Sequence, residues 1–298
     1  ETIYVCQQRQ EWYREYARAG GEEPLGFVGS ARLDRAPEAV AARMREALGF
    51  DLEERRTCPT WTEALRRFVE QADELGVLVM CSGIVKNDTH RKLNTEEFRG
   101  FAMADDVAPL VFINGADTKS AQMFTLAHEL AHIWLGASAL SDTRPDSLPE
   151  ESSREASLDS GATEIWCNRV AAELLVPLTA LREALPAGDP LADIQRLARR
   201  FKVSTLVLLR RIHDVGGISK ARFHREYEAE LERLAALPSG TGGNFYLTQA
   251  ARVSQRFAYA IVSNTLEGHT LFKDAFRMLG ISKEKTFQKL GQNLGLPV

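Results

Sequence analysis

The sequence lacks several features that define specialised classes of protein. No apolar run approaches the roughly 18 residues of a membrane-spanning helix, and no signal peptide is visible. The four cysteines form no CxxC pair, which predicts a reducing compartment, the cytoplasm. The net charge of −4 and the isoelectric point near 6.0 argue against a surface that coats nucleic acid or anionic membrane as a whole.

What remains is the composition of a folded globular protein. The chain has 298 residues, of which 44% are hydrophobic and 26% are charged. This length is enough for about two domains. The first residue is Glu1 and not methionine, so we expect that a segment upstream has been removed or left out.

The first quarter of the chain predicts helices. Trp12, Tyr13 and Tyr16 are spaced to share one helical face. Residues 37–49 begin with proline and end with glycine, as helices tend to do, and residues 60–76 place apolar side chains at helical spacing.

The periodicity then changes to that of strands. Residues 76–85, 98–105 and 109–114 are short, apolar segments that predict a small antiparallel sheet. A helix that includes FTLAHELAHIWLG, residues 124–136, follows the third strand. The pattern indicates an α+β core with mainly helical extensions at both ends.

The HELAH motif on that helix has the spacing of a zinc site. His128 and His132 lie one turn apart and can reach a common point, whereas Glu129 is rotated by about 100° from His128. Glu129 is therefore predicted to be a general base that acts on a water activated by the metal, and not a ligand. The alternative is a buried helix with two hydrogen-bonded histidines. The chain has only six histidines, so two of them are unlikely to fall at this spacing around a glutamate by chance.

A third protein ligand must come from the acidic residues after His132. Most of them lie in a segment rich in serine, proline and acid that predicts a loop with solvated charges. The clear helix at 163–177 offers Glu164 and Glu173, which are nine residues, or about two and a half turns, apart and face opposite sides. Glu164 is the better ligand because Asn168, one turn later, can hydrogen-bond the site from outside the ligand shell. The acidic candidates are Asp142, Asp146, Glu150, Glu151, Glu155, Asp159, Glu164 and Glu173.

FTLAHELAHIWLG followed by EIWCNRVAAELLVP resembles the ImmA/IrrE family of metallopeptidases. The resemblance implies a gluzincin-like peptidase core with one zinc ion per chain. It implies that His128, His132 and Glu164 are the zinc ligands and that Glu129 is the catalytic glutamate. Cys167 departs from the family pattern, where alanine is commoner, and is expected to be a small buried residue; a metal ligand or redox switch is the minor alternative.

The chain is most similar to longer members that carry a Cro/repressor-like helix-turn-helix in front, which is expected to be missing here. The resemblance to these longer members implies a toxin–antitoxin or mobile-element system. A PIN-type ribonuclease toxin is one possible partner in such a system. The resulting hypothesis is a zinc-dependent metalloendopeptidase that acts on a repressor or antitoxin-like protein. The alternative is an antitoxin or binding module with a latent or structural zinc. A third reading is a DNA-binding regulator that depends on the missing N-terminus, and the oligomeric state stays open.

Four regions follow from this reading: a helical region at 1–59, the peptidase domain at 60–180, a helix-turn-helix-like domain at 181–236 and a helical region at 237–298. The second helix of the third region is mostly apolar, which favours packing against the peptidase over contact with DNA. The C-terminal region, from residue 245, has seven basic and three acidic residues. It is predicted to be either a solvated face or a partner-binding surface.

One further histidine is a candidate for the site. His90 lies in KNDTHR, between the predicted strands, and is expected either to contact the substrate or transition state, or to serve only as part of a loop. The second reading is the plainer one, because a lone histidine is more often structural than catalytic.

Overall fold

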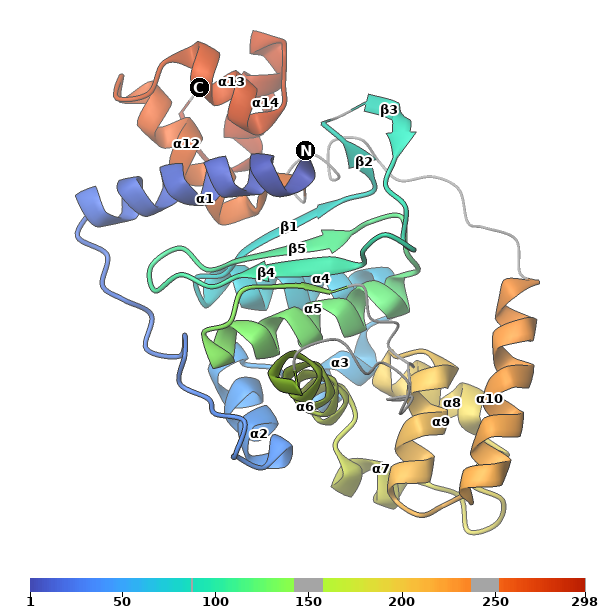
Figure 1. Ribbon diagram of the computed structural model, residues 1–298. Coiled ribbons are helices and arrows are strands. Elements are labelled where there is room, and N and C mark those ends of the chain that lie inside the picture. Colours follow the sequence, from blue (N-terminus) through green and yellow to red (C-terminus); the bar gives the residue numbers. More distant parts are fainter. Residues whose placement is uncertain (87, 142–157, 237–251, 298) are drawn as a thin grey trace.

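The computed structural model describes residues 1–86, 88–141, 158–236 and 252–297 (Figure 1). Its strands are β1 (Leu78–Ser82), β2 (Ile84–Val85), β3 (Asp88–Lys92), β4 (Gly100–Met103), β5 (Leu110–Asn114) and β6 (Ala139–Ser141). Its helices are α1 (Thr2–Ala19), α2 (Pro37–Leu48), α3 (Leu52–Thr57), α4 (Trp61–Glu74), α5 (Lys119–Leu135), α6 (Leu158–Leu175), α7 (Leu178–Ala184), α8 (Ile194–Phe201), α9 (Thr205–Asp214), α10 (Lys220–Ala235), α12 (Gln255–Leu266), α13 (Phe272–Leu279) and α14 (Glu284–Asn293). The α+β class predicted from the sequence is confirmed.

The central sheet is mixed and not wholly antiparallel, which corrects the prediction. Its strand order is β1-β5-β4-β6, with β1 parallel to β5 and the other neighbours antiparallel. An apolar run reveals that a strand exists but not its direction. The chain passes through β4 before it returns as β5, so β5 runs in the same direction as β1. Strands β2 and β3 form a separate antiparallel pair.

The two faces of this sheet bury different side chains because strand residues alternate between faces. One face packs against α4 and α5, and α6 packs on the far side of α5; we define these three helices as the central layer (Figure 1). The other face packs against a terminal layer, which we define as α1, α12, α13 and α14. Val79, Ala102, Val111 and Ile113 face the central layer, and Leu78, Met80, Phe101, Leu110 and Phe112 face the terminal layer.

Both ends of the described chain meet in the terminal layer. Arg9 Nε of α1 donates to the carbonyl oxygen of Met278, at the end of α13, over 2.8 Å. The ring of Trp12 packs edge-on against Phe257 of α12, with centroids 5.6 Å apart. Asp73, at the end of α4, accepts hydrogen bonds from the Ser254 hydroxyl at 2.5 Å and the Arg256 amide at 2.7 Å. These last bonds tie the terminal layer to the central layer.

A loop from the N-terminal region closes the end of α5. The amides of Gly29 and Ala31 donate to the carbonyls of Ile133 and Trp134, at 3.1 and 2.8 Å. These carbonyls belong to the last turn of α5, in which a carbonyl lacks the amide four residues later that would bond to it inside a helix. Gly136 approaches Gly29 so closely that a Cβ on Gly136 would lie 3.0 Å from the Gly29 Cα atom.

The helix-turn-helix-like region packs onto the central layer, as its apolar second helix predicted. Leu208 and Ile212 of α9 are fully buried, and Arg211 Nε donates to the Val176 carbonyl over 3.0 Å. The acidic candidates at 142–155 lie outside the described residues. The two hydrophobic clusters also cross the predicted boundaries at 59 and 180, because α2 and α3 join the central cluster whereas α1 joins the terminal one.

Two smaller observations concern the chain as a whole. All four cysteines, which lie within the described residues, are free thiols. Among the helices that the structure describes, none is long and apolar enough to cross a membrane.

Candidate metal centre

The helix α5 is positioned by its caps and by burial on every side. The Thr118 hydroxyl accepts a hydrogen bond from the Ala121 amide at the N-terminus, and Gly136, in the left-handed conformation, ends the helix. From Ala121 to Trp134 every residue of α5 is buried, so the helix lies inside the protein between the sheet and α6. The i, i+4 spacing then places His128 and His132 on the face that meets α6.

Glu164 completes a group of three from α6. Its Oε2 atom lies 3.1 Å from Nε2 of His128, and its Oε1 atom lies 3.2 Å from Nε2 of His132. The two Nε2 atoms are 3.1 Å apart. The structure therefore brings together the three residues that the sequence proposed as ligands, and these form a group of the kind that can hold a metal ion.

The spacing of the three ligand atoms fits a zinc ion. A tetrahedral site with metal–ligand bonds of about 2.0–2.1 Å has edges of about 3.3 Å between ligand atoms. The observed separations of 3.1–3.2 Å are close to that edge. Two imidazole nitrogens and one carboxylate are also a donor set that zinc accepts in catalytic centres.

The electrostatics favour the protonation states that ligands need. Burial lowers the pKa of His128, and the contacts with Glu164 offset this lowering only in part. Burial alone would raise the pKa of Glu164, but its hydrogen bonds and charge interactions with His128 and His132 outweigh burial and hold the pKa well below its usual value. A neutral imidazole and an ionised carboxylate are the ligating forms.

Glu129 lies at the junction between α5 and strand β4. Its side chain is fully buried. A Cβ built on Gly100 of β4 would lie 3.1 Å from Glu129 Oε1, 2.8 Å from the Phe112 carbonyl and 2.5 Å from Thr125. Only glycine at position 100 allows this close approach. No sequence pattern pointed to Gly100, because its role depends on how the strand lies over the helix.

His128, His132 and the neighbouring Cys167 are buried. Nδ1 of His128 and Nδ1 of His132 are buried and have no hydrogen-bond partner among the described residues. The Asn168 side chain acts on His128 by raising its pKa, a smaller effect than that of burial or of Glu164. Cys167 is fully buried, and burial followed by the charges of Glu164 and Glu129 raises the pKa of its thiol far above the usual value. This thiol is therefore unreactive, in agreement with the plain reading of the sequence.

Glu173 faces away from the metal group, as helical geometry predicted. Glu173 is only 6% exposed, pairs with Arg211 of α9 and accepts from the Leu178 amide at 3.3 Å. The sequence analysis did not predict this ion pair, because the two residues lie 38 positions apart and no local pattern reveals it.

The structure does not bring His90 to this group. His90 lies on β3, whose residues are all exposed, and its amide donates to Asp88 Oδ1 over 2.9 Å. Figure 1 shows the β2–β3 pair projecting away from α5 and α6. His90 therefore lies in an exposed strand and not in a loop as predicted.

An α+β fold with two histidines on one buried helix, a glutamate on the next and a second glutamate between the histidines defines a metallopeptidase-type centre. The comparison with known families agrees. Residues 72–213 match Peptidase_M78, described as the IrrE N-terminal-like domain, which supports a metallopeptidase of the ImmA/IrrE type in this part of the chain. Residues 253–293 match a domain of unknown function, DUF8813. Searches of the curated proteins and of the solved structures found no match.

Proposed function

We propose that the protein is a zinc-dependent metalloendopeptidase that cleaves one specific regulatory protein, a repressor or antitoxin-like partner, in a bacterial toxin–antitoxin or mobile-element system. The observation that supports it best is the tetrahedral spacing of His128, His132 and Glu164 at 3.1–3.2 Å. The family gives the class of reaction. The partner and the system are inferred from resemblance alone.

Each residue of the site has a distinct role in this proposal. His128, His132 and Glu164 would hold the zinc ion, which when bound supplies Lewis-acid activation of water and of the scissile carbonyl. Glu129 takes a proton from the attacking water and passes it to the leaving amine. Its full burial keeps competing water away from this carboxylate.

The sheet suggests where a substrate would bind. Strand β4, which contacts Glu129, is already paired on both sides, by β5 and β6. Among the described strands the free edge on this side is therefore β6, which follows α5 after a short connection. An extended peptide would add to β6 or replace it. The ligand that solvent reaches is Glu164, whose side chain is 24% exposed, so the substrate would approach from α6.

The second candidate function is an antitoxin that binds a toxin such as a PIN-type ribonuclease, with the zinc latent or structural. The observation that favours it is an apolar surface far from the metal centre. Leu271 and Phe272, at the start of α13, are 72% and 50% exposed. A peptidase does not need this surface, whereas a binding module does.

The test compares the wild type with Glu129→Gln and with Glu228→Gln, a matched control on the exposed face of α10. Each zinc-loaded protein is incubated with the product of the neighbouring gene, and the intact mass of that product is measured. Glu129→Gln should keep its zinc and lose about 100-fold or more in cleavage rate, because the general base is gone. Retained cleavage by Glu129→Gln would contradict the mechanism. A partner that stays whole but co-elutes with all three proteins would favour the antitoxin.

A further inference from the structure

A groove lies where the terminal layer meets α4. It has a volume of about 430 Å³ and lies between α1, α4 and α12. This volume falls within the roughly 300–1,000 Å³ of small-molecule sites. Tyr13, Tyr16 and Tyr259 supply its aromatic walls, and its carboxylates include Glu22, Glu70 and Glu74. Neither the family assignment nor the proposed peptidase gives this groove a role.

The groove has a strongly negative lining. Four carboxylates line it, those of Asp73 and of the three glutamates, against one cation, Arg256. Burial first, and then the charges of Glu267 and Glu22, raise the pKa of Tyr16. The arginines that pair with Glu70 and Glu74 come from the exposed surface of α4 and do not line the groove. Such exposed pairs are weak, so a ligand can compete with them.

The protein's own Arg256 shows how this lining holds a cation. Its guanidinium lies 5.9 Å from the centroid of the Tyr13 ring. Its Nε atom donates to the Tyr13 hydroxyl over 2.6 Å, and a second nitrogen donates to Glu22 over 3.0 Å. An aromatic face and a carboxylate together make a favourable environment for a guanidinium. Tyr259 with Glu70 and Glu74 offers the same combination in the more exposed part of the groove.

We propose that this groove binds an organic cation, a guanidinium or an amine on an aliphatic stem, with Tyr16 and Tyr259 against the stem and Glu70 and Glu74 as counter-charges. The same chemistry is found in an arginine side chain of a partner protein and in a free polyamine. Because α4 belongs to the central layer and α1 and α12 to the terminal layer, such a ligand bridges the two layers. The proposal does not depend on the metal centre.

The test is isothermal titration calorimetry of the full chain at low salt with three probes. Nα-acetyl-arginine methylamide represents the peptide side chain, and spermidine represents the polyamine. Nα-acetyl-citrulline methylamide has nearly the shape of the arginine probe without its charge. Saturable binding of the arginine probe or of spermidine, weakened by added salt, is the expected result, and the tighter of the two identifies the source. Equal binding of the citrulline probe, or no binding of any probe at millimolar concentration, overturns the proposal.

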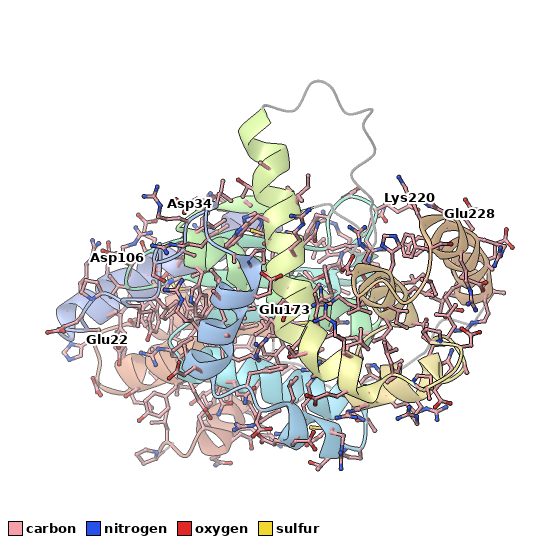
Figure 2. All side chains as sticks on the ribbon, turned by 90° about the horizontal axis from the view of Figure 1, so that it is seen from below. Glu22, Asp34, Asp106, Glu173, Lys220 and Glu228 are labelled. Carbon is pink, nitrogen blue, oxygen red and sulfur yellow. The ribbon has the colours of Figure 1, made fainter. Side chains whose placement is uncertain are left out.

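Variants locate the binding within the groove. The double variant Glu70→Gln/Glu74→Gln should weaken binding by about fivefold, and Tyr259→Ala by about threefold. Glu228→Gln is the matched control, since Figure 2 shows Glu228 and the groove residue Glu22 at opposite ends of the molecule. All of these side chains are at least partly exposed, so the variants should fold, which their thermal melts will verify. Unchanged affinity in both groove variants would overturn the proposal.

Discussion

The helices that cover the two faces of the central sheet differ in how far apart they lie in the sequence. The central layer is assembled from α4, α5 and α6, which lie close together in the sequence, and it holds the metal group. The terminal layer is assembled from α1 and α12–α14, which are separated by more than two hundred residues of chain. The two layers share the same strands, since successive residues of β1 and β5 alternate between them. A single sheet thus supports a chemical site on one face and a separate helical surface on the other.

This difference indicates which parts of the molecule depend on each other. The three metal ligands lie on α5 and α6 of the central layer, and the groove lies where the terminal layer meets α4. The hydrogen bonds of Asp73 to Ser254 and Arg256 are one direct link between the layers. Variants that act on one layer alone will show whether the layers unfold separately.

The largest expected effect comes from removing one buried aromatic ring in each layer. Phe68→Ala in the central layer and Phe257→Ala in the terminal layer should each lower the free energy of unfolding by about 3–5 kcal/mol, because both side chains are fully buried. Phe68→Ala should also release zinc at a lower urea concentration, whereas Phe257→Ala should not. Urea titrations that follow tryptophan fluorescence and zinc content in parallel measure both quantities. Zinc release at the same urea concentration in the two variants would mean that the layers unfold as one unit.

A smaller, pH-dependent effect is expected at the link between the layers. Burial raises the pKa of Asp73 to about 6, from an ordinary value of 3.8. The folded state therefore binds this proton more tightly than the unfolded state, so the free energy of unfolding falls as the pH rises from about 4 to 6, by about 3 kcal/mol. Asp73→Asn should remove this part of the pH dependence. The measurement is the difference between wild-type and variant unfolding free energies across that range, and a difference that does not change with pH would refute the assignment.

The smallest expected effects come from two arginines that join helices through a carbonyl. Arg9 links α1 to Met278 over 2.8 Å, and Arg45 links α2 to Glu173 over 2.7 Å. Changing either to alanine should cost about 1–2 kcal/mol, since each leaves a carbonyl without its charged donor. Arg45→Ala should weaken zinc retention and Arg9→Ala should leave it intact, as measured by competition with a chelator. The reverse order would show that the terminal layer supports the metal centre.

The two histidine ligands were predicted because their geometry is local, whereas Glu164 was chosen from helix spacing and from the resemblance to the family. Two histidines four residues apart must share a helix face, and a nine-residue separation must place Glu164 and Glu173 on opposite sides of theirs. Strands β1, β4 and β5 were predicted from their apolar runs, whereas β3, which is polar and exposed, and β6 were not predicted. Trp12, Tyr13 and Tyr16 were also correctly placed on one helix face, and the structure packs them into the terminal cluster.

The features that were missed depend on contacts between distant residues. The parallel pairing of β1 with β5, the burial of Glu173 against Arg211 and the approach of Gly100 to Glu129 are all set by tertiary packing. The same holds for the meeting of α1 with α12, which no local pattern specifies. These errors share one cause, which is that periodicity describes a segment and not its neighbour.

The loop that closes the end of α5 has a practical consequence for recombinant expression. The family match starts at residue 72, yet Gly29 and Ala31 supply the amides for the carbonyls of Ile133 and Trp134. A fragment cut at residue 60 or 72 would expose these carbonyls and the Trp134 ring, which Phe27 covers with ring centroids 4.4 Å apart. The shortest fragment expected to stay soluble therefore begins before Leu25, whose amide bonds to Asp106. For this protein, the boundaries of the homologous sequence are not those of a foldable unit.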